Sequence, residues 1–373
     1  MEMTLLLLLL CARVCYTAAN SRLRKFSVIQ LRCNWTTALS YCKSNHSTLA
    51  TMYNQEEYEQ QKQLLRNGIS NAWIGLNRQR YRLKWSNGDP VNASAWPSLP
   101  SENQYSYCAS MHTNTTWSLC TDPKIFMCYG NGPGDSFPQY RLIKQNLTWY
   151  EAQNYCRYNL IDLVSIMNER QKEEVKNCGM NSTTPFWIGL LYDDWEWADG
   201  GKSAYRKWST IAPYPKENIL RNYTYLMKSL EDIFTVSLKN KCDGAICSEG
   251  SVRVHIIREK KIWEDALNYC NKHHDGLLRF ESAEDLSAID QQLKGTNLTG
   301  PVWIGLRQSS LFGFWVWTNG LSVNPEDWSN WEGGIWPQLP LSHQCGAMET
   351  KKGYKWVDQD CLSQLYFVCE ELI

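Results

Sequence analysis

The chain has 373 residues, which is too long for one compact core and suits two or three domains. Its 38 Lys and Arg balance its 38 Asp and Glu, so no field of one sign exists to attract a phosphate backbone or an anionic membrane, and we expect no nucleic-acid partner. Trp and Tyr, at 18 and 20 residues against 9 Phe, suit small extracellular domains, because the apolar ring packs inward while its polar edge meets solvent.

The N-terminus has the pattern of a secretory signal peptide. The apolar run at residues 5–10 is too short to span a bilayer, and small residues up to Ala19 offer a cleavage site, although Glu2 is atypical of the segment before such a run. We expect residues 1–19 to be removed. No later stretch approaches about 18 apolar residues, so we expect a secreted, extracellular protein without a membrane anchor.

Potential N-glycosylation sites agree with that compartment. Eight Asn-X-Ser/Thr sequons in a chain with a signal peptide favour passage through the secretory pathway. We expect most of them on exposed loops: Asn34, Asn45, Asn92, Asn114, Asn146, Asn181, Asn222 and Asn297.

A repeated pattern predicts a helix near the start of each third of the chain. Trp-x-x-Ala-x-x-Tyr-Cys at 35–42 recurs at 149–156 and at 263–270, each copy displaced by 114 residues. Positions i, i+3 and i+7 share one face of a helix, so we expect the Trp, Ala and Cys of each copy to face a core.

Further repeated elements follow each helix in the same order. A second helix is predicted 12 residues beyond each Cys, where pairs three residues apart resemble capping boxes: Asn54/Glu57, Asn168/Gln171 and Ser282/Asp285. Trp-Ile-Gly-Leu at 73–76, 187–190 and 303–306 then predicts a buried strand. A Trp closely followed by Asn-Gly or Asp-Gly marks a strand that enters a turn, at Trp85, Trp197 and Trp317.

The period of the repeat sets the expected domains at 24–129, 138–248 and 252–371. The glycine-rich segment 130–134 is a linker by composition. The connection at 248–251 is shorter, so we expect the second and third domains to be held closer together.

These motifs resemble the C-type lectin-like domain. Two helices, Trp-Ile-Gly-Leu and a closing Phe-x-Cys (Phe126/Cys128 and Phe367/Cys369) carry the resemblance, which covers nearly the whole mature chain in three copies. The tandem arrangement is similar to the ectodomains of macrophage mannose receptor relatives. The resemblance implies an α+β fold in which each domain has two helices, small antiparallel sheets and disulfide staples.

The resemblance also implies a disulfide framework. The 15 cysteines, without Cys11 and Cys15 of the leader, leave an odd number. In domains of this kind the first-helix Cys pairs with the last Cys, and two Cys flanking the ligand loop pair with each other, each bond contributing roughly 3–5 kcal/mol. The implied pairs are Cys42–Cys128 and Cys108–Cys120 in the first domain and Cys270–Cys369 and Cys345–Cys361 in the third. Zinc is not expected, since no Cys-x-x-Cys occurs.

The second domain departs from this pattern. Thr224 stands where a loop Cys is expected, and Cys242 and Cys247 are five residues apart where the other domains have eight. We expect Cys156–Cys247 and a Cys178–Cys242 pair. Cys33 is then left over, either as a buried free thiol beside the first helix or as an intermolecular disulfide that makes a dimer.

Calcium ligands of the sugar-binding relatives are largely missing. These relatives hold Ca²⁺ with a Glu-Pro-Asn or Gln-Pro-Asp triplet, a nearby Glu and the Asn and Asp of Trp-Asn-Asp, and calcium needs six to eight oxygen ligands. The first domain has Ser118-Leu119 after its Trp, the second has Lys216 after its loop Pro, and the third keeps Asp358 but has Val357 for Asn. We therefore expect no metal cofactor, with calcium at the third domain as the disfavoured alternative.

An acidic and Trp-rich loop in the third domain is the candidate ligand loop. It can be a solvated loop, a displaced cation site or a set of polar contacts to a protein partner. Its tryptophans can stack on sugars, form interface hot spots or pack within the loop. The candidate residues are Asn324, Glu326, Asp327, Trp331, Glu332, Trp336 and Asp358.

No catalytic constellation accompanies the scaffold, and His273-His274-Asp275 at a helix exit is interpreted as a polar loop. We therefore expect a secreted, non-enzymatic recognition protein that binds an extracellular protein or a glycan without calcium. The alternative is a calcium-dependent lectin that acts through the third domain. A third interpretation is a structural or decoy ectodomain whose second domain is a spacer.

Overall fold

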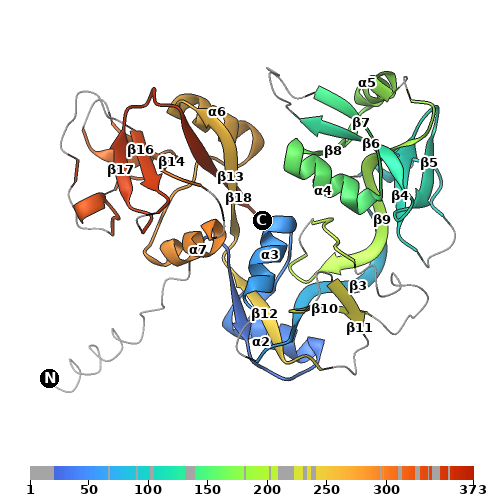
Figure 1. Cartoon of the computed structure of the whole chain (residues 1–373), viewed down its shortest axis with the longest axis horizontal. Helices are drawn as coiled ribbons and strands as arrows, with labels where there is room; N and C mark the ends of the chain where they lie inside the picture. Colours follow the sequence, from blue (N-terminus) through green and yellow to red (C-terminus); the bar gives the residue numbers. More distant parts are fainter. Residues whose placement is uncertain are drawn as a thin grey trace, which may run out of the picture. The chain divides into compact units, whose positions relative to one another are not determined.

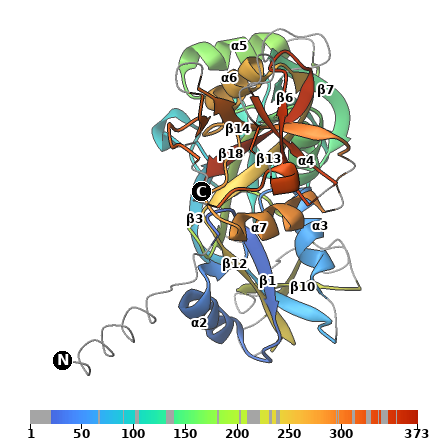
Figure 2. The same cartoon turned by 90° about the vertical axis from the view of Figure 1, so that its left-hand side faces the viewer.

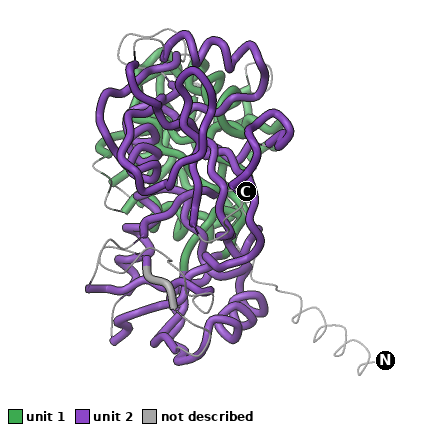
Figure 3. The backbone as a smooth tube through the Cα atoms, turned by 90° about the vertical axis from the view of Figure 1, so that its right-hand side faces the viewer, with its two compact units in different colours: residues 1–26, 249–373 green, residues 27–248 purple. Residues whose placement is uncertain are grey.

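A computed structural model shows the chain as two compact units (Figure 3): unit 1 comprises Met1–Phe26 and Glu249–Ile373, and unit 2 comprises Ser27–Ser248. The structure describes residues 21–65, 68–89, 91–100, 105–130, 139–179, 182–200, 203–208, 222–229, 233–236, 241–294, 296, 298–309, 313–323, 328–334, 336–337, 345–351 and 353–373. The fold is α+β, as expected, with a helix at the start of each sequence repeat followed by a second helix.

Unit 1 contains the third repeat and shows how one repeat folds on itself. Its elements are β13 (Val252–Lys261), α6 (Trp263–His273), α7 (Glu284–Leu293), β14 (Pro301–Gln308), β15 (Trp315–Trp317), the 3₁₀ turn η2 (Glu332–Gly334), β16 (Cys345–Glu349), β17 (Trp356–Gln359) and β18 (Leu365–Leu372). The sheet order is β13-β18-β14-β16-β17, with β15 folded back on β14. β14 runs antiparallel to β16 and parallel to β18.

The segment before the first repeat completes unit 1. Leu23 is fully buried in the core of the third repeat and forms a parallel bridge with Val252. The Ser21 hydroxyl donates to the carboxylate of Asp285, 2.8 Å away, at the start of α7. Because this contact joins residues far apart in the sequence, the repeat period alone did not reveal it, and the expected start of the first domain at residue 24 falls inside this segment.

Unit 2 contains the first and second repeats. The first repeat supplies β1 (Lys25–Ile29), α2 (Trp35–Asn45), β2 (Thr48–Leu49), α3 (Gln55–Gln63), β3 (Asn71–Trp85), the 3₁₀ turn η1 (Ala93–Ala95), β4 (Tyr107–Met111), β5 (Thr115–Leu119) and β6 (Lys124–Gly130). The second supplies β7 (Gln139–Leu147), α4 (Trp149–Asn159), β8 (Asp162–Leu163), α5 (Glu169–Gly179), β9 (Phe186–Trp197), β10 (Tyr223–Met227), β11 (Ile233–Val236) and β12 (Gly244–Glu249).

Local sequence explains the elements that all repeats share. The predicted inward-facing Trp, Ala and Cys of α2, α4 and α6 are all buried, which confirms that expectation. Each helix Trp donates its indole N–H to the Ile carbonyl of Trp-Ile-Gly-Leu in its own repeat, as Trp35 does to Ile74 at 2.8 Å. The motif needs glycine because a Cβ at Gly75 would lie 2.8 Å from the carbonyl oxygen of Leu49.

The second helices begin where the capping pairs predicted, with one difference. Asn54 and Asn168 accept backbone N–H groups three residues on, from Glu57 and Gln171, at 2.9 Å. Ser282 does not act in this way, since α7 has no side-chain cap. Asp285 still accepts the Glu281 N–H at 2.9 Å with one carboxylate oxygen, as Glu57 and Gln171 accept N–H groups at the starts of their helices. Its other oxygen accepts from the N-terminal segment.

The first and second repeats have exchanged their C-terminal halves. β3 of the first repeat runs antiparallel to β10 and parallel to β12, both of the second repeat. β9 of the second repeat pairs in the same way with β4 and β6 of the first. These are the partners that β14 finds within its own repeat in unit 1. In Figures 1 and 2 the exchange is visible as the gold β12 beside the blue α2.

Unit 2 therefore has two lobes that the repeat boundaries do not delimit. We call residues 27–76 with 197–248 the first lobe, and residues 85–190 the second lobe. Each lobe is built from both repeats, so the expected domains 24–129 and 138–248 are repeats of the sequence and not separate structural units. The second repeat is accordingly not an independent spacer.

The exchange takes place at one hairpin. In unit 1, Leu306 of Trp-Ile-Gly-Leu pairs with Trp317 of the same repeat, because β15 folds back on β14. In unit 2 the corresponding pairs are Leu76 with Trp197 and Leu190 with Trp85, each between different repeats. The hairpin has thus opened into two long strands, β3 and β9, that run antiparallel between the lobes (Figure 1). Such an opened hairpin is the usual hinge of a domain swap.

Turn chemistry explains why only the third repeat folds back. Its connection, 307–316, contains Gly313 at φ 74°, a left-handed conformation that glycine adopts without steric cost, and Gly313 N–H donates to the Ser309 carbonyl oxygen at 2.8 Å. The corresponding connections 77–84 and 191–196 contain neither Gly nor Pro. A straight strand is therefore favoured over a tight turn in the first two repeats.

Charge complementarity joins the two opened strands. The β3 connection carries cations at alternate positions, and the β9 connection carries three acids. The cross-strand ion pairs are Arg78–Asp194 at 2.6 Å, Arg82–Glu196 at 3.0 Å and Lys84–Asp193 at 2.8 Å. These pairs are diagonal in the strand register, and opposite charges at neighbouring positions of a strand pair stabilise it, whereas two copies of the β3 connection would repel each other.

The disulfides follow the exchange and correct two expected pairings. The bonds Cys42–Cys247 and Cys128–Cys156 each join the two repeats, so the expected pairs Cys42–Cys128 and Cys156–Cys247 are wrong. The same ten cysteines are bonded as expected, but the long-range partners differ because β6 and β12 have changed places. The bonds that do not depend on the exchange have the expected partners: Cys108–Cys120, Cys270–Cys369 and Cys345–Cys361.

The expected Cys178–Cys242 pair is also wrong. Cys178 lies exposed on α5 as a free thiol, and Cys242 is buried in the first lobe, also free. Cys33 is the third free cysteine and is buried as well.

Candidate functional site

The candidate ligand loop of the third repeat is organised by tryptophans. Trp331 is only 2% exposed, and its ring centroid lies 4.7 Å from that of Trp315 and 5.8 Å from that of Trp356. Trp336 and Trp328 pack against the same cluster. Of the three roles considered for these tryptophans, packing within the loop is the one that this geometry favours.

Two of the polar candidates of this loop lie on different elements. Glu332 is exposed in η2 and Asp358 is half-buried in β17, whereas Asn324, Glu326 and Asp327 lie outside the described residues. Beside them, the Asn330 amide donates to the Tyr354 carbonyl at 2.8 Å and its oxygen accepts from the Lys355 ammonium at 2.7 Å. The Lys355 ammonium, bound to Asn330, therefore already occupies the polar side of the described part of the loop.

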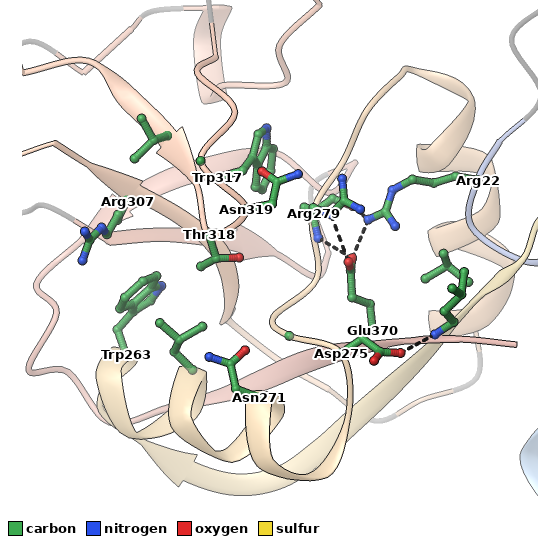
Figure 4. A pocket seen from close by; sticks show the side chains of 16 residues that line it. Arg22, Trp263, Asn271, Asp275, Arg279, Arg307, Trp317, Thr318, Asn319 and Glu370 are labelled. Atoms are coloured by element: carbon green, nitrogen blue, oxygen red, sulfur yellow. Dashed lines mark hydrogen bonds and ion pairs between the residues drawn. The ribbon is translucent and has the colours of Figure 1, made fainter.

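A cavity of about 580 Å³ opens elsewhere in unit 1 (Figure 4). Its walls come from α6, from the turn after β15 and from the N-terminal segment docked on β18. The indoles of Trp263 and Trp317 supply an apolar wall. Exposed polar and charged side chains stand around it: Asn271, Asp275, Arg307, Thr318 and Asn319.

One end of the cavity is a closed ion-pair network. Glu370 accepts the Arg279 guanidinium at 3.0 Å and also pairs with Arg22. The Arg22 Nη1 group is buried without a hydrogen-bond acceptor among the described residues. Arg307, on the side of the cavity away from Glu370 (Figure 4), is exposed and has no ion-pair partner in the described part of the chain. The cavity lining therefore combines a cation without an ion-pair partner in the described part of the chain with two indoles.

The sequence did not reveal this cavity, because the residues that line it lie far apart in the chain. Arg22 was placed before the first domain, and Glu370 closes the third, so nothing in the local pattern links them. Arg307, in the connection after Trp-Ile-Gly-Leu, was accessible to a search for unpaired cations next to aromatic residues.

Among the described residues, one group brings together three side chains able to ligate a metal: His255, His274 and Glu371, with ligand atoms within 4.8 Å of one another. The His255 Nε2 atom lies 2.7 Å from a Glu371 oxygen that the Arg253 guanidinium also contacts, at 2.9 Å. The two imidazoles stack with centroids 4.3 Å apart. Because an arginine neutralises the carboxylate and stacked rings do not converge on one point, we interpret the group as an ion-pair network.

This network makes unit 1 sensitive to acid. Burial lowers the pKa of His274 to about 3, and the nearby His255 adds to the shift. Burial opposes ionisation of Glu371, but His255 and Arg253 outweigh it and hold its pKa at about 2. Both groups contribute stability at neutral pH that is lost on acidification, since the unfolded chain binds their protons first.

We expect the free energy of unfolding of unit 1 to fall as the pH drops from 6.5 to 4.5, a window in which His274 titrates only in the unfolded chain. The His274 contribution is up to about 1.4 kcal/mol for each pH unit. His274→Phe keeps the stacked ring without a titrating group, so its stability should fall less over this window. Urea unfolding at several pH values measures both proteins, and equal slopes would contradict the assignment.

The described N-glycosylation candidates are mostly exposed. Asn45, Asn92, Asn114 and Asn146 are exposed, whereas Asn34 and Asn222 are half-buried. The Asn34 side chain also caps α2 by accepting the Thr37 N–H at 2.9 Å. Asn181 and Asn297 lie outside the described residues.

A model of the Lectin C-type domain matches residues 32–130, 145–247 and 259–371, which is most of the chain. The chain belongs to the C-type lectin domain family. The tandem arrangement expected from the sequence agrees with its relatives among multidomain receptors. No helix in the described part of this C-type lectin is long and apolar enough to cross a membrane.

The relatives are considerably longer proteins. The chain is 22% identical to the secretory phospholipase A2 receptor of Bos taurus over 90% of its own length and 27% of that receptor. It is 22% identical to human lymphocyte antigen 75 over 72% of its length and 19% of that protein. It thus spans about a quarter of the length of the curated relatives it matches.

Solved structures match one repeat at a time. The carbohydrate-recognition domain of mouse scavenger receptor C-type lectin shares 28% identity and a TM-score of 0.27, covering 33% of this chain and 89% of that one. Human lithostathine shares 23% identity and a TM-score of 0.30, covering 33% and 93%.

Proposed function

We propose that this C-type lectin is a secreted, non-enzymatic recognition protein that binds an extracellular protein or glycan without calcium. The observation that carries the proposal is the tryptophan cluster of the third repeat. Trp315, Trp331 and Trp356 order the described part of the loop by apolar packing, which favours a binding surface that does not depend on an ion. The name of one relative, a receptor for secretory phospholipase A2, supports a protein ligand.

We further propose that the cavity of unit 1 contributes to ligand binding. The cavity lining combines the exposed guanidinium of Arg307 with the Trp263 and Trp317 indoles, which fits a ligand that presents both an acidic group and an apolar or sugar face. Hydroxyl and amide groups at Thr318 and Asn319 add hydrogen-bonding capacity at the rim. Acidic glycans and acidic peptides share this chemistry.

Calorimetric titration of Ca²⁺ into the chelator-stripped protein tests the calcium part of the proposal. We expect no heat of binding. Binding to an array of neutral, sialylated and sulfated glycans, with and without chelator, follows, and we expect binding that favours acidic glycans and resists chelator. A calcium heat with chelator-sensitive binding would establish the alternative, a calcium-dependent lectin that uses Asp358 and the acidic residues of the candidate loop. Binding to no glycan would exclude the glycan part of the proposal.

Charge reversal tests the cavity. Arg307→Glu should weaken binding to an acidic glycan by about tenfold or more, because a charge-assisted hydrogen bond is lost and repulsion replaces it. Lys351→Glu makes the same change in net charge at an exposed position of unit 1 that does not line the cavity, so it should leave the affinity unchanged. Equal effects of the two variants would mean that general charge, and not the cavity, guides binding.

A further inference from the structure

Two of the free cysteines lie opposite each other in the first lobe. Cys33 and Cys242 form an antiparallel bridge, and the Cys242 N–H donates to the Cys33 carbonyl at 3.2 Å. Both side chains are buried, at 8% and 4% exposure, in one apolar cluster that also contains the Cys42–Cys247 disulfide. The Cα atoms of directly paired antiparallel residues are about 4.5–5.5 Å apart, which lies within the range that a disulfide spans, about 4.4–6.8 Å.

Cys33 has no counterpart in the other repeats, and Cys242 lacks the partner that its counterparts have. The positions that correspond to Cys33, one period further on, are Leu147 and Lys261. Cys242 corresponds to Cys120 and Cys361, whose partners are Cys108 and Cys345, but its own partner position holds Thr224, whose hydroxyl donates to the Leu76 carbonyl at 2.6 Å. Cys242 has therefore lost the usual loop partner, and the first repeat has gained a cysteine that faces it.

The shortened end of the second repeat places Cys242 two residues before β12. Cys120 and Cys361 stand eight residues before the last cysteine of their strands, whereas Cys242 stands five before Cys247. In the unshortened repeats the residue two positions before the first helix pairs with a strand residue beyond the loop cysteine, as Leu147 does with Lys124 and Lys261 does with Leu365. Lys124 and Leu365 stand four residues before the last cysteine, so the deletion of three residues brings the loop cysteine within one residue of this pairing position, and the Cys33–Cys242 bridge forms there.

The two cysteines meet only because the repeats have exchanged halves. Cys33 belongs to the N-terminal half of the first repeat and Cys242 to the C-terminal half of the second. Without exchange, Cys33 would face the β6 end of its own repeat, near the bonded Cys120, and Cys242 would face Leu147. The positions of both odd cysteines are thus explained by one arrangement of the chain, which is the exchanged one.

We propose that Cys33 and Cys242 form a third disulfide between the first and second repeats and lock the exchanged arrangement. The two thiols lose two protons and two electrons as their sulfur–sulfur bond forms. The electron acceptor is an exchangeable disulfide, of the oxidoreductase or glutathione class, which is reduced to two thiols through a mixed disulfide. The bond takes the place of the loop disulfide that the second repeat lacks.

Burial sets when this bond can form. It raises the pKa of both thiols, so in the folded lobe they stay protonated, and a thiol attacks a disulfide only as its thiolate. The exchange reaction therefore takes place during folding, before α2 and β12 close over the pair. The same burial disfavours the alternative of a Cys33-linked dimer, because a second chain cannot reach this sulfur.

Peptide mapping of the full secreted protein tests the proposal. The protein is denatured without reductant, alkylated and digested, and the disulfide-linked peptides are identified by mass. We expect one alkylated cysteine per chain, the exposed Cys178, and a linked peptide pair that contains Cys33 and Cys242. Alkylation of both Cys33 and Cys242, or a bond from either to Cys178 or to a second chain, would overturn the proposal.

Serine variants provide matched controls that do not depend on peptide recovery. Cys33→Ser and Cys242→Ser should each release the partner thiol, so that the count of alkylated cysteines rises from one to two. The double variant should return the count to one. If neither single variant changes the count by one, the two cysteines are not bonded to each other.

Discussion

Cleavage of the chain within residues 131–138 should leave two fragments that remain joined under denaturing, non-reducing conditions. Cys42–Cys247 and Cys128–Cys156 both cross this site, because the first and second repeats have exchanged their C-terminal halves. A protease recognition sequence inserted within residues 131–138 of the Cys33→Ser variant provides the cut. Electrophoresis should show one band without reductant and two bands with it.

Repeats that had not exchanged their halves would give a different electrophoresis result. If each repeat closed on itself through Cys42–Cys128 and Cys156–Cys247, no disulfide would cross the cut, and the fragments would separate without reductant. The Cys33→Ser background is needed because the proposed Cys33–Cys242 bond would otherwise also hold the fragments together. Removing Cys42 and Cys247 together should leave them joined through Cys128–Cys156 alone.

The second large effect is expected at the ion pair buried where the two opened strands meet. Asp193 of β9 is fully buried between Lys84 of β3, at 2.8 Å, and Arg206, at 3.1 Å. Burial opposes ionisation of Asp193, but the two cations outweigh it and hold its pKa below the ordinary value. Asp193→Ala leaves the Arg206 charge buried without a counter-ion. We expect the free energy of unfolding to fall by about 3–5 kcal/mol, measured by urea unfolding of the oxidised protein followed by Trp fluorescence.

A neighbouring acid on the same strand gives the matched control. Glu196 pairs with Arg82, whose side chain is 64% exposed, so Glu196→Gln should cost less than about 1 kcal/mol. Asp193→Leu combined with Arg206→Met replaces two charges by apolar groups and should be more stable than Asp193→Ala. Equal losses for Asp193→Ala and Glu196→Gln would show that the buried position carries no special weight.

These two predictions address the same physical question, which is what makes two repeats share their halves. The disulfides join the exchanged halves covalently, whereas the charges of β3 and β9 favour the exchange through noncovalent contacts. The basic connection of β3 and the acidic connection of β9 are complementary only when the first repeat pairs with the second. The third repeat, with Gly313 in its connection, folds back and needs no partner strand.

The sequence by itself determined the elements and their local packing. The period of 114 residues located the first helices, and the i, i+3, i+7 pattern identified their buried faces, because these features depend on contacts within about a turn of helix or between a helix and the next strand. Trp35 and Ile74 meet in this way within one half-repeat, so the repeat boundaries were a sound guide to them. The family followed from the same motifs.

Only the tertiary structure decided which halves belong together. The period of a repeat is the same whether β6 or β12 closes a lobe, so Cys42 has two equivalent candidates for a partner, Cys128 and Cys247. The choice depends on whether the chain turns back after Trp-Ile-Gly-Leu. The absence of glycine from a connection of six or eight residues is only weak evidence against a turn until the complementary strand is seen beside it. The cavity of unit 1 was hidden for a related reason, since Arg22 and Glu370 meet only when the chain ends pack together.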